Sequence, residues 1–111
     1  MKTFKSELSR LIDNNIDDHI RFVVHPHSKE ETDSLFEIFE QYNVIVPVPD
    51  LTLEKYREHA ENEFGKDVCY EVNLSTMITT SNNVEHWKQY TKDIVEWDAE
   101  NEKFKFIEGC E

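Results

Sequence analysis

Glycine and proline are scarce in this sequence, which has two glycines and three prolines among 111 residues. This composition excludes a low-complexity chain and a long flexible linker. A loop that cradles phosphate needs clustered glycines, and two isolated ones cannot form it. So few glycines also leave little loop from which to build the concave pocket of an enzyme. We therefore expect a compact protein that is not an enzyme.

Cysteine is also scarce, with Cys69 inside an expected strand and Cys110 next to the last residue. Two cysteines in these places indicate no disulfide framework. Reactive thiols usually need a helix amino terminus or basic neighbours, so we interpret Cys69 as a partly buried hydrophobic residue. The amino terminus has no apolar signal core, and no apolar run is long enough to span a bilayer. These absences predict a cytoplasmic protein that does not bind membranes.

Basic residues are few relative to acidic ones: 12 lysines and arginines accompany 24 aspartates and glutamates, and the formal net charge is −12. Such a charge repels nucleic acids and anionic membranes, and the basic cluster of a nucleic-acid-binding domain is missing. One explanation is that the acidity only keeps the protein soluble. The other explanation is that an acidic face binds a basic partner.

The acidic residues are unevenly distributed, and no lysine or arginine occurs from Glu30 to Glu54. Four carboxylates in this run recur at helical spacings of three, four and three residues. They predict one negative stripe on a helix, on the side away from Leu35 and Phe39. These candidate partner-binding residues are Glu30, Asp33, Glu37 and Glu40.

A second run without lysine or arginine extends from Asp93 to Glu102. Its last four acidic residues occupy every second position. On an extended strand the alternating residues would project from the same face. These further candidates are Glu96, Asp98, Glu100 and Glu102. Like charges at such spacings repel one another, and rows of carboxylates at roughly the spacing of backbone phosphates can imitate DNA.

Hydrophobic periodicity predicts one α+β domain over residues 1–111, with a single small mixed or antiparallel sheet of about five strands and two to three helices on one face. The spacing favours helices over 1–15, from Ser28 to Tyr42 and over 53–64, with a short helix after 81–83. Strands are expected over 20–24, 44–48, 68–74, 77–80, 94–97 and 104–107. The expected core includes Phe22, Leu35, Phe39, Val72 and Trp87.

The two histidines of the sequence His25-Pro26-His27 would face the same way on an extended segment. Together with Cys69 or His19 they could form a metal site. No established zinc-binding spacing accompanies them, and the proline between them favours a turn in which both rings face water. We therefore expect no metal and no cofactor.

Two segments resemble a broad class of small acidic proteins encoded by phages and mobile elements of Gram-positive bacteria. The first is I-R-F-V-V-x-x-x-S-K-E-E at positions 20–31, which leads into L-F-E-I-F-E-Q-Y. The second is W-x-x-Y-T-K-D-I-V-E-W at positions 87–97. The resemblance implies a protein of the bacterial host cell that inhibits host nucleases, repair enzymes or defence systems such as CRISPR effectors. Some members of the class occupy a nucleic-acid-binding cleft, and the class has no catalytic residues.

The leading hypothesis is thus a non-enzymatic, DNA-mimic-like inhibitor that binds a basic nucleic-acid-binding host protein. It would not bind nucleic acid itself. The alternative is an immunity-type or regulatory module that binds a protein without imitating nucleic acid. A third hypothesis, a small enzyme or metal protein, would use Cys69 and the histidines. The oligomeric state is left open.

Overall fold

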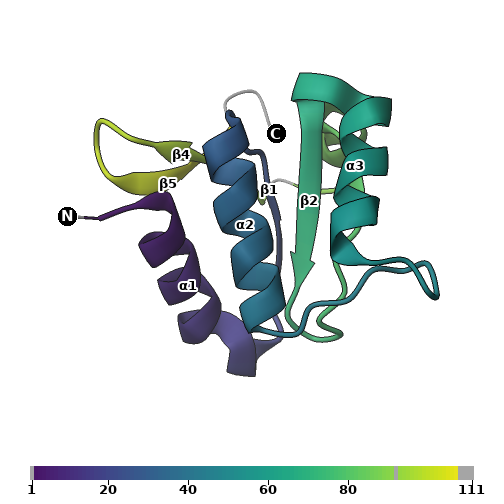
Figure 1. Ribbon diagram of the computed structural model, residues 1–111. Helices are drawn as coiled ribbons and strands as arrows, with labels where there is room; N and C mark the ends of the chain where they lie inside the picture. The colour runs from purple at the N-terminus through teal and green to yellow at the C-terminus, as the bar shows by residue number, and fades with distance from the viewer. Residues whose placement is uncertain (1, 92, 108–111) are drawn as a thin grey trace.

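The computed structural model describes residues 2–91 and 93–107, which form one five-stranded mixed sheet with helices on it. The strand order is β3-β2-β1-β4-β5, and the predicted α+β class is confirmed. Figure 1 shows α2 in front of β1, with α1 on one side of it and α3 on the other. The strands are β1 (Arg21–Val24), β2 (Val68–Asn73), β3 (Ser81–Asn83), β4 (Ile94–Asp98) and β5 (Lys103–Phe106).

The long helices are α1 (Phe4–Asn15), α2 (Lys29–Gln41) and α3 (Leu53–Phe64), and each begins after a hydroxyl residue. The Thr3 and Thr52 side chains accept bonds from backbone amides of the first turns of α1 and α3. Ser28 Oγ accepts from the amide of Glu31 at 3.1 Å. Such caps satisfy amides that lack a partner within the helix. Serine and threonine therefore position the starts of all three helices.

The centre of the sheet is β1, which pairs antiparallel with β2 and parallel with β4. Its register places Phe22 opposite Val72 and Val23 beside Ile94. The chain leaves β1 at Pro26, where no amide proton is available to continue the ladder. The segment after β1 therefore lies beside the segment that contains β4, although the two are far apart in sequence.

The strand expected over Val44–Val48 is absent, so this prediction was wrong. Only an isolated bridge joins Ile45 to Ile78, while Pro47 follows within two residues and Pro49 soon after. Proline cannot donate to a strand ladder, and this limits pairing to the one bridge. Ile45 and Val48 consequently remain exposed. The segment is a connection between α2 and α3 rather than a strand.

The main core lies between the sheet and the three long helices. Phe22 and Val72 from the sheet are buried there with Leu35 and Phe39 of α2, which confirms four of the five core predictions. Phe4 and Leu8 of α1 belong to the same cluster. Burial of these side chains removes the largest apolar area from water and is the main stabilising contribution to the fold.

The opposite face of the sheet is covered as well, by the short helix α4 (Val84–Lys88). Val84 and Trp87 pack against Val23, Cys69 and Ile94. The prediction that helices cover one face only was therefore wrong. Trp87 was predicted to be buried, but it is half-buried. Residues 81–83, expected only to precede a short helix, form the edge strand β3 before Asn83 caps α4. The strand expected over 77–80 was wrong, because only Ile78 takes part in isolated bridges.

Candidate functional site: an acidic groove between two helices

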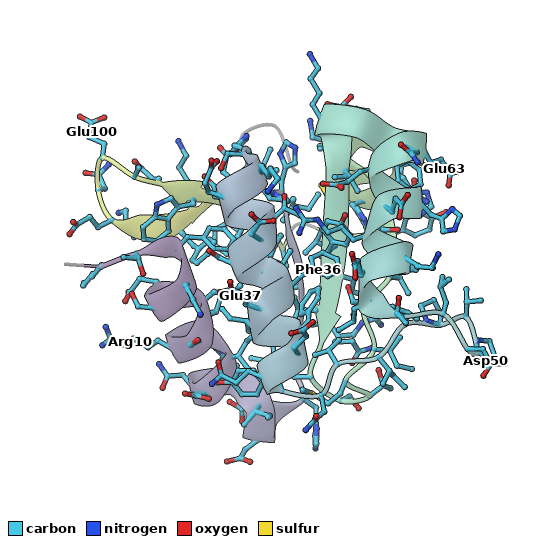
Figure 2. The ribbon with its side chains drawn as sticks, in the orientation of Figure 1. Arg10, Phe36, Glu37, Asp50, Glu63 and Glu100 are labelled. Carbon is cyan, nitrogen blue, oxygen red and sulfur yellow. The ribbon has the colours of Figure 1, made fainter. Side chains whose placement is uncertain are left out.

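The predicted stripe of carboxylates lies along α2, on the side away from Leu35 and Phe39. Figure 2 shows Glu37 on the outer surface of α2 and Phe36 on the side facing α3. Glu30, Glu37 and Glu40 are exposed, and Asp33 is half-buried. The helical spacing therefore brings the four carboxylates to one surface, as the sequence predicted.

Part of this stripe borders an open groove between α2 and the start of α3, with a volume of about 320 Å³. The floor is apolar and the rim is acidic, because α3 adds a carboxylate to those of α2. Sequence analysis missed this contribution, since Glu54 ends the run without bases but lies on a different helix. The residues that line the groove are Asp33, Phe36, Glu37, Glu40, Leu53, Glu54 and Arg57.

Basic residues of α1, α3 and the first turn of α2 neutralise two of the stripe carboxylates. Lys5 Nζ of α1 lies 2.8 Å from Glu37 Oε2. Asp33 receives Arg57 Nη2 at 2.7 Å and Lys29 Nζ at 3.1 Å. The absence of lysine and arginine from this part of the sequence therefore does not produce a surface without cations, because α1 and α3 supply cations across the helix interfaces.

Arg57 connects α3 to α2 and is part of the groove rather than a free cation. Its guanidinium lies 5.6 Å from the centre of the Phe36 ring and also bonds Glu61 Oε2 at 3.5 Å. Hydrogen bonds from Arg57, and then from Lys29, lower the pKa of Asp33. Burial lowers the pKa of Arg57, but Asp33 and Glu61 outweigh this effect and raise it. Asp33 is therefore an ion-pair partner at all physiological pH values.

Three carboxylates of this surface have no ion-pair partner within the described ranges: Glu30, Glu40 and Glu54. All three side chains are exposed. An exposed carboxylate without a cation keeps its full charge, and it is available to a basic partner. These residues are the strongest candidates for binding within the stripe and its extension on α3.

The second acidic run does not form one row along a strand, because β4 ends at Asp98 and the chain turns there. Glu100 and Glu102 lie in the turn, and Glu102 has a φ of 52°. The Asp98 carboxylate bonds the side chain and backbone of Asn101, which lowers its pKa. Figure 2 shows Glu100 at the tip of this hairpin. Asp98 therefore stabilises the turn, while Glu100 is exposed at its end.

Glu96, the first of the four candidate residues in the second acidic run, contacts two basic side chains. Its carboxylate contacts His27 Nε2 on one oxygen and lies 3.8 Å from Lys105 Nζ on the other. The His25 ring lies next to His27, with ring centres 4.6 Å apart. His25, His27 and Glu96 are the described residues whose ligand atoms could hold a metal ion, and neither Cys69 nor His19 belongs to the group.

Cys69 is buried under α4, and its Sγ contacts the carbonyl of Asp67 at 3.7 Å. Burial, with a smaller contribution from the charge of Asp67, raises the pKa of the thiol from 9.0 to about 12. A protonated thiol is a weak nucleophile, so the structure agrees with the interpretation of Cys69 as a core residue. Cys110 lies outside the described residues.

In a Cys110→Ser variant, Cys69 should react with a thiol reagent far more slowly in the native protein than in denaturant. Because folding raises the thiol pKa, the stabilisation is complete below pH 9 and is lost as the pH rises toward about 12. Absorbance of the reaction product measures the rate, and urea melts at pH 8 and above measure the stability. Equal rates in the native and unfolded protein would contradict the burial of this residue.

No protein-family model, curated protein or solved structure matches the chain. The resemblance to phage-encoded inhibitors therefore stays a prediction. Within residues 2–91 and 93–107, no helix combines the length and apolar character needed to cross a bilayer.

Proposed function

We propose that this protein is a non-enzymatic inhibitor whose acidic surface binds the basic nucleic-acid-binding cleft of a host nuclease, repair or CRISPR defence protein. The observation that carries the proposal is the α2–α3 groove. Its lining includes the carboxylates of Asp33, Glu37, Glu40 and Glu54 but only one cation, Arg57. A surface of this kind attracts arginine and lysine side chains that otherwise hold phosphates.

The apolar floor adds to the argument. Phe36 and Leu53 lie among the charges of the groove. Arginine and lysine combine an apolar stem with a charged head, so an apolar floor with an acidic rim complements both parts of these side chains. The remaining acidity increases the association rate through long-range attraction, and this attraction falls with ionic strength.

A triple variant tests the groove: Glu30→Gln, Glu40→Gln and Glu54→Gln. It removes the carboxylates that lack ion pairs and leaves Asp33 and Glu37 with their cations. We expect partner capture from bacterial lysate to weaken tenfold or more, which corresponds to about 1.4 kcal/mol. The melting temperature should change little, because relief of the repulsion along α2 offsets the lost interaction of Glu30 and Glu54 with the amino ends of α2 and α3.

The matched control removes the same number of charges elsewhere, in Asp17→Asn, Asp18→Asn and Glu63→Gln. These side chains are exposed and outside the groove, so capture should change little. Added double-stranded DNA should release the captured protein if the groove occupies a nucleic-acid site. Capture that DNA cannot release would favour an immunity-type module without mimicry. If the groove variant and the control bind equally at low and high salt, the groove is only a solvated surface.

A further inference from the structure

The His25-Pro26-His27 segment is fixed beside β4 by the parallel pairing of β1 with β4. The amide of His25 donates to the carbonyl of Val95 at 2.9 Å, which places the next residue of β4, Glu96, next to the histidines. The ligand atoms of His25, His27 and Glu96 all lie within 4.8 Å of one another. Side chains separated widely in sequence thus converge through the topology of the sheet.

The backbone around this cluster is anchored at several points. His25 Nε2 lies 3.1 Å from the carbonyl of Lys66, which can only accept a hydrogen bond, so Nε2 is the donor and, in the neutral ring, Nδ1 has a free lone pair. The amide of His27 donates to Glu31 Oε1 at 3.2 Å. A histidine whose second nitrogen donates to a carbonyl is the usual arrangement of a metal ligand.

We infer that His25, His27 and Glu96 form a binding site for one divalent ion of the zinc class. The donor atoms would be one nitrogen from each ring and one carboxylate oxygen. Two imidazoles and a carboxylate are a donor set that zinc accepts, with further coordination positions left to water. This inference opposes the expectation from the sequence that both rings only face water.

The geometry needs a small contraction to hold an ion. Bonds of about 2.0–2.1 Å in a tetrahedral site place neighbouring ligand atoms roughly 3.4 Å apart. The ligand atoms of the cluster now lie up to 4.8 Å apart. The side chains of His27 and Glu96 are 44% and 20% exposed, so both can rotate without disturbing the core. His27 Nε2 and Glu96 already touch, and the ion would replace this contact.

Charges of both signs surround the cluster, with carboxylates on the side of His25 and Glu96. Asp67 and Glu85 line the same hollow as His25 and Glu96, a cavity of about 370 Å³ beside α4. Lys105 Nζ, 3.8 Å from the second oxygen of Glu96, opposes a cation, and so do Lys29, Arg57 and Lys66, which line a second hollow together with His27. Because Glu96 alternates with Val95, which faces the long helices, its carboxylate projects from the other face of the sheet, and none of the three cluster residues lines the α2–α3 groove. Metal binding and partner binding can therefore be tested separately.

The experiment is a calorimetric titration of chelator-treated protein with zinc chloride in excess magnesium chloride, which occupies sites made of carboxylates alone. We expect one equivalent of zinc to bind and to raise the melting temperature, since a ligand of the folded state stabilises it. The nitrogen signals of the His25 and His27 rings should shift in the NMR spectrum. These measurements use the unchanged protein and do not depend on the folding of a variant.

Two variants, His27→Gln and Glu96→Gln, should each weaken zinc binding at least tenfold. His59→Gln is the matched control, because His59 is exposed on α3 and does not belong to the cluster. Zinc binding that disappears in excess magnesium would overturn the inference. So would unchanged binding in both cluster variants, or ring signals of His25 and His27 that do not respond to zinc.

Discussion

Replacement of Phe39 by alanine should lower the free energy of unfolding by about 3–5 kcal/mol, as large-to-small changes at buried aromatic residues do. The side chain has no solvent exposure and meets the Phe36 ring edge-on, with ring centres 5.0 Å apart. Phe36 in turn meets Tyr70 of β2 in the same manner. A cavity at Phe39 would therefore loosen the contact between α2 and the sheet. Urea denaturation measures the change.

The control for this substitution is Phe106→Ala at the edge strand β5. Phe106 is 63% exposed, so its truncation should change stability by no more than about 0.5 kcal/mol. If the loss at Phe39 were below about 1 kcal/mol, the buried face of α2 would be wrongly assigned.

Replacement of Arg21 by methionine should destabilise the protein by about 2 kcal/mol or more. Arg21 Nη2 lies 2.7 Å from Glu71 Oε2, and the Glu71 side chain is only 10% exposed. Removal of the cation leaves a largely buried carboxylate with one remaining bond, from Thr80 Oγ1 at 3.4 Å. Fully buried pairs lose 3–5 kcal/mol in this way, and the 64% exposure of Arg21 reduces the expected effect here.

A second substitution separates two effects of the Arg21→Met change: the unpaired charge left on Glu71 and the lost contacts of the arginine side chain. Adding Glu71→Gln to the Arg21→Met variant removes the uncompensated charge and keeps an acceptor for Thr80. The double variant should therefore be more stable than Arg21→Met alone. Strictly additive losses in urea melts would show that the two residues do not interact.

Local signals in the sequence were sufficient for the long helices and the carboxy-terminal hairpin. Gly65 ends α3 with a φ of 59°, and Asn43 follows α2 with a φ of 58°, both in the left-handed region that favours such residues. The two strands of the carboxy-terminal hairpin were also predicted, because acids and Asn101 separate two apolar segments. In these places the residue chemistry and the backbone geometry agree.

The helix that covers the second face of the sheet was harder to predict. Alternation along a strand separates polar from apolar residues but does not show what packs on each face. Val23 and Cys69 alternate with core residues, and no local pattern indicated that a helix would cover them, yet α4 does. Even Glu71 is buried on this side, since Arg21 balances its charge. A helix as short as α4 has too few residues for periodicity to reveal what it covers.

For the candidate sites, the spacing of residues along the chain predicted contacts within one helix but not contacts between elements. Helical spacing predicted the stripe on α2, but Lys5 and Arg57 reach it from other helices and change its charge. The pair of histidines was visible in the sequence, whereas Glu96 joins them only through the pairing of β1 with β4. Neither contact leaves a local pattern, so only the tertiary structure could reveal them.

The central position of β1 also affects how the chain can fold while a ribosome makes it. β1 emerges before its parallel neighbour β4, and α2, α3, β2, β3 and α4 are all synthesised between them. Until β4 arrives, one edge of β1 has backbone groups without partners, next to the apolar Val23 and Val24. Contacts between such distant segments form slowly, so the nascent chain must keep this edge from other strands until translation has passed Asp98.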